Sequence, residues 1–119
     1  MTVLPGRPGF YKETDMPWIL LVVAGLLEIV WATAMKCSEG FTRPGPTIVM
    51  VVGMIASFWL LAVAMRSLPL GTAYMVWTGI GAVGSFIIGV VFLAEPVTAM
   101  RLLAAGLIVV GIVTMKLAS

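Results

Sequence analysis

Four long apolar segments, separated by short polar stretches, dominate the chain. They cover residues 17–36, 46–65, 72–94 and 98–117. About 20 helical residues match a bilayer hydrocarbon core of roughly 30 Å, so each segment is long enough to cross a membrane. The segments are almost continuously apolar, whereas the strands of a membrane β-barrel alternate apolar and polar residues. The pattern therefore predicts an all-α membrane protein with four transmembrane helices, in which short loops make successive helices antiparallel neighbours.

Polar and helix-breaking residues indicate where the spans end. Pro96 disfavours helix in the residue before it, so the third span should end at about residue 94. In the fourth span, the uncharged stretch covers only residues 102–115. We therefore expect Arg101 and Lys116 to lie at the two membrane interfaces, with apolar stems buried and charged heads in water.

The first fifteen residues differ from the rest of the chain because they are polar and contain prolines, glycines and charges. We interpret residues 1–15 as a polar, mobile N-terminal extension and residues 16–119 as the four-helix transmembrane domain. Met16 is an alternative start of translation. A cleaved signal peptide is the competing interpretation, but the apolar segment is long and has no clear small-x-small cleavage site.

The composition supports a membrane protein and excludes most other classes. Hydrophobic residues make up 61% of the chain and charged residues 10%, whereas soluble domains carry about 25% charged residues. The chain has no histidine and a single cysteine, Cys37. We therefore expect no enzyme activity, no metal site and no cofactor. The net charge of +2 comes from scattered basic residues, which does not indicate nucleic-acid binding.

The basic residues are divided almost evenly between the two sides of the membrane. With four spans, one side carries Arg7, Lys12, Arg66 and Lys116, and the other carries Lys36, Arg43 and Arg101. Orientation depends on an excess of Lys and Arg in cytoplasmic loops, and almost none exists here. The sequence leaves open a fixed orientation or dual topology. Four helices are too few to enclose a polar pathway with material to spare, so we expect a homodimer. If its two copies insert in opposite orientations, the site would lie near the midplane of the membrane.

Glu28 is the one acidic residue in the middle of the first span. A charged side chain at the bilayer centre costs on the order of 2.5–3.5 kcal/mol or more, so such residues usually serve a function. Small residues, among them Gly25, lie one turn away and leave space, and Trp31 adds an aromatic surface and an N–H donor. The pattern favours an ion or substrate site; a neutral glutamic acid in a packing face is the alternative.

Further polar and small residues occur in the second and third spans. Ser57 either donates to Glu28 or bonds the carbonyl one turn back in its own helix. Tyr74 and Trp77 are three residues apart and share a helical face, either at the site or in an interfacial aromatic belt. Gly79 and Gly81 permit close packing or a hinge.

Several segments together resemble the small multidrug resistance family, and in particular its guanidinium-exporter branch. They are residues 28–31 and 36–43, residues 71–81 in the third span, and residues 95–101. The resemblance covers nearly everything from residue 16 onwards. It implies a multi-pass protein of the bacterial inner membrane that forms an antiparallel, dual-topology homodimer, held together by the fourth helices.

The resemblance also implies a function, a proton-coupled antiporter that exports guanidinium ion. Its partners would then be guanidinium, protons, a second copy of the chain and the lipid bilayer. The implied binding residues are Glu28, shared by proton and substrate; Ser57, Tyr74 and Trp77, which hold its carboxylate; and Gly25 and Trp31, which line the pocket, with Gly79 and Gly81 as hinge. Export of small substituted guanidinium ions, export of quaternary ammonium drugs, and a non-transporting accessory role stay open as alternatives.

Overall fold

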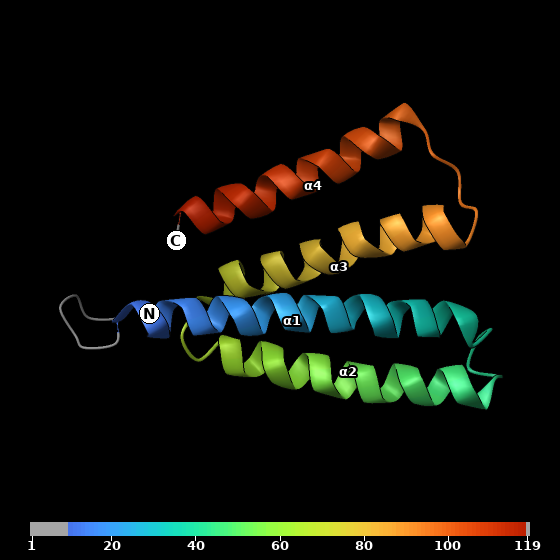
Figure 1. The fold of residues 1–119 in the computed structure, drawn as a ribbon, viewed down its shortest axis with the longest axis horizontal. Coiled ribbons are helices and arrows are strands. Elements are labelled where there is room, and N and C mark those ends of the chain that lie inside the picture. Colours follow the sequence, from blue (N-terminus) through green and yellow to red (C-terminus); the bar gives the residue numbers. More distant parts are fainter. Residues whose placement is uncertain (1–9, 119) are drawn as a thin grey trace.

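Four helices form the part of the chain that the structure describes, residues 10–118, in a computed structural model (Figure 1). They are α1 (Phe10–Cys37), α2 (Pro44–Ala64), α3 (Leu70–Phe92) and α4 (Ala99–Ala118). All four are long and apolar enough to span a membrane, which confirms the predicted all-α architecture. In lipid, every backbone polar group needs a partner within the protein, and a helix supplies these partners locally.

The first helix begins earlier than the hydrophobic pattern predicted. It starts at Phe10, so residues 10–15, which we expected in the polar extension, continue into the helix. Pro17 lies inside α1; its ring removes one backbone hydrogen bond without ending the helix. The remainder of the expected extension, residues 1–9, lies outside the described residues.

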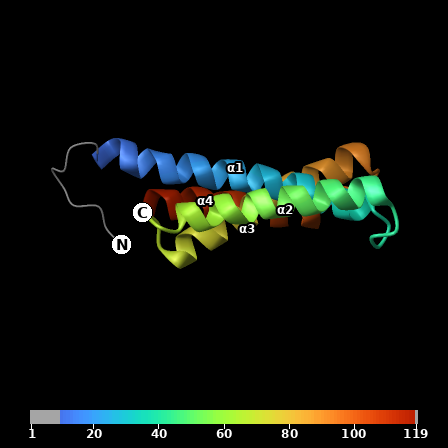
Figure 2. The same cartoon turned by 90° about the horizontal axis from the view of Figure 1, so that it is seen from below.

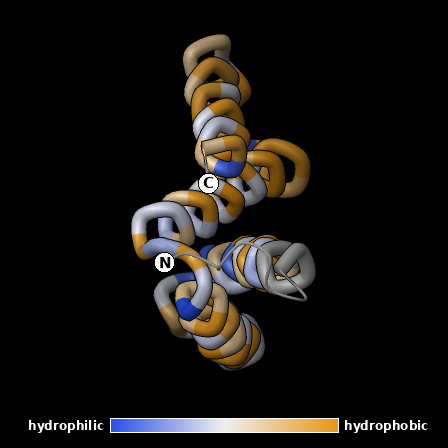
Figure 3. Tube along the Cα trace, turned by 90° about the vertical axis from the view of Figure 1, so that its left-hand side faces the viewer, coloured by the Kyte–Doolittle hydropathy of each residue, from blue (hydrophilic) through white to orange (hydrophobic). Residues whose placement is uncertain are grey.

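The helices form an open arrangement rather than a closed bundle. Helix α1 packs against both α2 and α3. Helix α4 packs mainly against α3, and its Lys116 Nζ also lies 4.9 Å from the centre of the Trp18 ring of α1. Seen end-on, α4 therefore extends away from the α1–α2 pair (Figure 3), and a side view shows the helices running roughly side by side along the long axis of the molecule (Figure 2).

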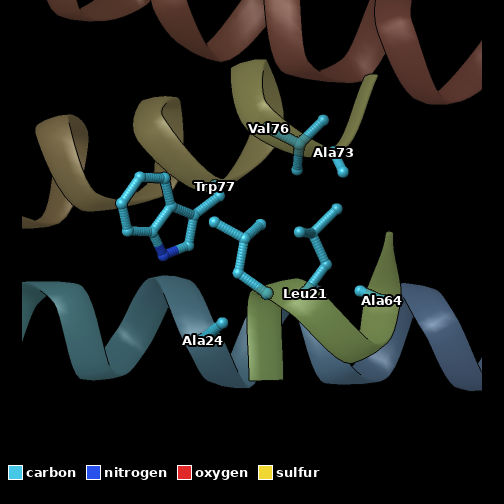
Figure 4. Packing of buried hydrophobic residues seen from close by; sticks show 7 residues of the cluster. Leu21, Ala24, Ala64, Ala73, Val76 and Trp77 are labelled. Carbon is cyan, nitrogen blue, oxygen red and sulfur yellow. The ribbon is translucent and has the colours of Figure 1, made fainter. Parts of the chain in front are cut away.

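A small core joins α1, α2 and α3 at the end of the molecule near the α2–α3 turn (Figure 4). Three of its seven buried members are alanines: the members are Leu21, Ala24, Leu61, Ala64, Ala73, Val76 and Trp77. Small side chains let membrane helices approach closely, and association in lipid depends on such packing because apolar burial from water contributes little there.

Two strained loops set the helix ends. Between α1 and α2, the residues Glu39, Gly40 and Phe41 all have positive φ angles, of 51°, 74° and 70°. The buried Ser38 stabilises this turn, because its hydroxyl donates to the Met35 carbonyl (2.7 Å) and accepts from the Phe41 N–H (3.1 Å). Between α3 and α4, Ala94 has a φ of 56° and Pro96 follows two residues later.

Helix α4 carries no buried residue in its described length. Several of its apolar side chains, including Leu103, Leu107 and Val110, are more than half exposed. In a membrane protein such a surface faces either lipid or another protein helix.

Candidate functional site

Glu28 faces α3 from the middle of α1, and its carboxylate lies directly against the backbone of Gly81. A Cβ atom on Gly81 would collide with the Glu28 carboxylate carbon and Oε1. The same Oε1 is buried and accepts no hydrogen bond from any described residue. A buried polar atom without a partner costs about 1–3 kcal/mol, so this oxygen is a natural position for a proton or a cation.

Glycines bring α1 and α3 together around the carboxylate. A Cβ on Gly25 would lie 2.6 Å from a side-chain carbon of Ile80, and a Cβ on Gly84 would collide with Ile29. Together with Gly81, the glycines Gly25 and Gly84 let α1 and α3 pack closely on both sides of Glu28 along the helix axis. The site is therefore tight, which favours a small ligand over a bulky one.

A buried hydrogen-bond chain joins three helices one turn from Glu28. The indole N–H of Trp77 donates to the Ser57 hydroxyl (3.0 Å), and that hydroxyl donates to the Ala24 carbonyl (2.7 Å). A hydroxyl has one hydrogen and an indole has one N–H, so neither donates to Glu28 in this arrangement. The Ser57 bond differs from both expected partners, the Glu28 carboxylate and the carbonyl one turn back in α2.

An aromatic row runs across the same region. The ring of Phe58 lies 6.0 Å from Trp31 and 5.7 Å from Trp77, and Trp77 lies 5.6 Å from Tyr74. Edge and tilted contacts of this kind are favourable for aromatic pairs. Phe58, which links the two tryptophans, was not among the predicted site residues. Its only sequence signal was its position next to Ser57.

Trp31 presents a second unpaired group close to Glu28. Its indole nitrogen is buried and donates no hydrogen bond to any residue in the described part of the chain. Trp31 lies three residues after Glu28, on the same face of α1. An unpaired acceptor on Glu28 and an unpaired donor on Trp31 thus lie three residues apart on α1.

Comparison with known proteins identifies the family. A family model described as "Small Multidrug Resistance protein" matches residues 16–108. The chain belongs to the small multidrug resistance family. Relatives named "Guanidinium exporter" from Yersinia pseudotuberculosis and Escherichia coli K12 are 58% and 56% identical over 104 residues. Each alignment covers 87% of this chain and nearly all of the relative, and a Citrobacter freundii protein of the same name is 54% identical.

Membership of the small multidrug resistance family fits the four apolar helices and makes the chain a multi-pass protein of a bacterial inner membrane. The names of these relatives describe exporters, which are membrane transporters rather than enzymes. Among the described residues, no group of three or more His, Cys, Asp or Glu side chains is placed to hold a metal ion.

Tyr74 of this small multidrug resistance chain packs against Trp77 and also faces α4. It is 52% exposed and helps to line an apolar groove of about 370 Å³ between α3 and α4. The groove also contains Thr78, Gly79 and Ile112, whereas Glu28 does not line it. Of the residues that the resemblance implied, the structure gathers Gly25, Glu28, Trp31 and Gly81 into one contact region, with Ser57 and Trp77 beside it.

The two predicted hinge glycines both have packing neighbours. The missing side chain of Gly79 makes room for Ile112 and Ile108 of α4, and that of Gly81 makes room for Glu28. Helix α3 is continuous from Leu70 to Phe92. The structure thus gives these glycines a role in close packing, and the hinge stays a prediction.

Proposed function

We propose that this chain is a proton-coupled antiporter that exports guanidinium ion across the bacterial inner membrane. The observation that carries the proposal is the buried, unpaired carboxylate oxygen of Glu28, held against Gly81 at the middle of the membrane span. The name of the relatives, "Guanidinium exporter", supports the choice of cation, since they match along 87% of the chain.

The chemistry of the site suits a guanidinium ion. A guanidinium is planar and presents N–H donors in a fork that matches the two oxygens of a carboxylate. The ring of Trp31 can add a cation–π contact, worth roughly 0.5–2 kcal/mol. The glycine contacts of Gly25 and Gly81 leave little room for a bulky cation beside Glu28.

Exchange follows from competition for one carboxylate. Burial penalises the charged form of a carboxylic acid, so an empty, ionised Glu28 is disfavoured and either a proton or a guanidinium neutralises it. If the transporter reorients only when Glu28 is occupied, an inward proton gradient drives guanidinium outward.

In this proposal, Ser57 and Trp77 respond to that occupancy. Their hydrogen-bond chain ends on the Ala24 carbonyl, one helical turn before Glu28. Rotation of the Ser57 hydroxyl from Ala24 toward Glu28 would stabilise the ionised carboxylate when neither cation is bound. The hydrogen bonds of Trp77 and Ser57 would thereby couple the occupancy of the Glu28 carboxylate to the packing of α1, α2 and α3.

The functional unit in this proposal is an antiparallel homodimer. Helix α4 has no buried residue in its described length, and it offers a long apolar surface to a second copy. The near-even split of basic residues allows both orientations in the membrane. Two copies would bring two Glu28 carboxylates to the midplane, as in inverted-repeat transporters.

Counterflow of labelled guanidinium in proteoliposomes, measured at two pH values, tests the proposal. We expect uptake against a guanidinium-loaded interior, weaker uptake at the lower pH, and proton flux that depends on guanidinium. Strong competition by bulky quaternary ammonium ions would favour a broad drug exporter of the same fold. The absence of any substrate-dependent proton flux would favour a non-transporting accessory protein.

Trp77→Phe should lower guanidinium transport about tenfold without unfolding the protein. An aromatic ring remains, although it is smaller than the indole, but the N–H that donates to Ser57 is lost, and one hydrogen bond contributes about 0.5–1.5 kcal/mol net. Initial transport rates would measure the loss of activity, and thermal unfolding would show whether the variant stays folded. Trp59→Phe is the matched control, because Trp59 is 66% exposed and should be neutral. Equal rates for both variants would contradict the role given to Trp77.

A further inference from the structure

The loop between α3 and α4 contains a second arrangement of polar and aromatic groups, away from Glu28. Arg101, in the first turn of α4, extends back over this loop. One of its guanidinium nitrogens, Nη1, donates to the Pro96 carbonyl (3.0 Å), and the other, Nη2, lies 3.7 Å from Glu95 Oε1. Its central carbon lies 5.2 Å from the centre of the Phe86 ring. A carboxylate, a carbonyl and an aromatic face therefore surround one guanidinium group.

The backbone of the loop holds Glu95 in place for this contact. The Glu95 N–H donates to the Gly89 carbonyl (3.0 Å), which also accepts from the Leu93 N–H (3.1 Å). The Glu95 carboxylate lies against Gly89, where a Cβ atom would collide with it. The positive φ of Ala94 turns the chain so that Glu95 returns over the end of α3. The carboxylate is thus positioned by α3 and the loop, independently of Arg101.

Carboxylate, carbonyl and aromatic face are the three kinds of group that recognise a guanidinium ion. The carboxylate pairs with the N–H fork, and the ring attracts the flat cation. We propose that the α3–α4 loop forms a second guanidinium-binding site, built from Glu95, Pro96 and Phe86 and filled in the resting chain by the side chain of Arg101. The site contains none of the residues around Glu28.

The occupant of this site is held weakly enough to exchange. The side chains of Arg101 and Glu95 are each 38% exposed, and ion pairs with such access to water contribute little. A cavity of about 160 Å³, lined in part by Phe86 and Arg101, adjoins the site and gives the head group room to leave. When Arg101 is truncated, the groups that surrounded it match a free guanidinium ion of the same shape.

Guanidinium binding in a background without the primary carboxylate tests this site directly. Purified Glu28→Gln protein and the double variant Glu28→Gln/Arg101→Ala would be titrated with guanidinium chloride by calorimetry. We expect the double variant to bind guanidinium at a saturable site, with at least about tenfold higher affinity than the Glu28→Gln protein. The reason is that the Arg101 side chain no longer competes for this site. Glu28→Gln/Arg101→Gln removes the guanidinium group but keeps a polar side chain at this position, and it should gain the same site, which covers poor folding of the alanine variant.

A second readout follows the loop itself. Hydrogen exchange at the Leu93 and Glu95 amides, which both donate to Gly89, should accelerate in Arg101→Ala. Millimolar guanidinium chloride should restore protection, and ammonium chloride at the same concentration should not, because ammonium lacks the planar fork. Adding Glu95→Gln should remove both the new binding site and the restored protection.

Two results would overturn the proposal. One is the absence of a new guanidinium site in both Arg101 variants of the Glu28→Gln background. The other is equal protection by guanidinium and ammonium. Neither readout requires transport, so a failure here is distinguishable from a failure of the exporter function, which the proteoliposome experiment measures.

Discussion

Glu28→Gln is expected to abolish proton-coupled guanidinium transport. Glutamine has nearly the same size and keeps a side-chain oxygen beside Gly81, but it neither ionises nor pairs with a cation. Both competing ligands would then lose their common site. We expect uptake in proteoliposomes to fall to the level of protein-free vesicles, with no guanidinium-dependent proton flux at either pH.

Glu39→Gln is the matched control for this substitution. Glu39 lies in the α1–α2 loop, its side chain is 71% exposed, and its contact with Arg43 is a long surface ion pair of 3.9 Å. The same chemical change there should leave transport within about twofold of the unsubstituted protein, because exposed ion pairs contribute little. Thermal unfolding should show both variants folded. Substantial proton-driven export by Glu28→Gln would refute the assignment of the shared site.

The number and order of the helices could be predicted because the signal is strong. Each span is a long apolar run, and backbone groups in lipid must bond within the helix. Glu28 is the candidate site residue for a related reason, since a carboxylate within such a run is costly. The apolar pattern also located the first membrane span, which the structure gives as Met16–Cys37. It has no means to indicate that residues 10–15, most of which are polar, continue the same helix.

The partners of each side chain could not be predicted from the sequence. The spans are apolar on nearly every face, so periodicity does not reveal how each helix is rotated. That rotation decides that Ser57 reaches the Ala24 carbonyl rather than Glu28, and that Phe58 rather than Tyr74 lies between Trp31 and Trp77. It also decides that Gly81, expected as a hinge, is where the carboxylate fits.

Because Gly81 contacts Glu28, adding a single methyl group at residue 81 should have a large effect on guanidinium binding. Gly81→Ala should weaken guanidinium binding and transport by on the order of ten- to a hundredfold. The added Cβ would occupy the position of the Glu28 carboxylate, and overpacking of this kind costs typically about 1–3 kcal/mol. Alanine is the better helix former, so any loss arises from the collision and not from helix propensity.

Gly71→Ala is the control on the same helix. A Cβ at Gly71 has nothing within 4 Å, so this substitution should leave binding unchanged and slightly stabilise α3. Guanidinium affinity by calorimetry and transport rate in proteoliposomes would be measured for both variants. Similar behaviour of the two would show that the carboxylate does not rest against Gly81.

A double-mutant cycle on stability separates the collision from any other effect of Gly81→Ala. With Glu28 intact, the added methyl group should lower the free energy of unfolding. In Glu28→Ala the colliding carboxylate is gone, so the same methyl group should be neutral or stabilising. The expected coupling energy is about 1–3 kcal/mol, within the range measured for residues in direct contact. Additive effects would mean that Gly81 acts through α4 or the hinge, and that the close approach of α3 to Glu28 does not shape the site.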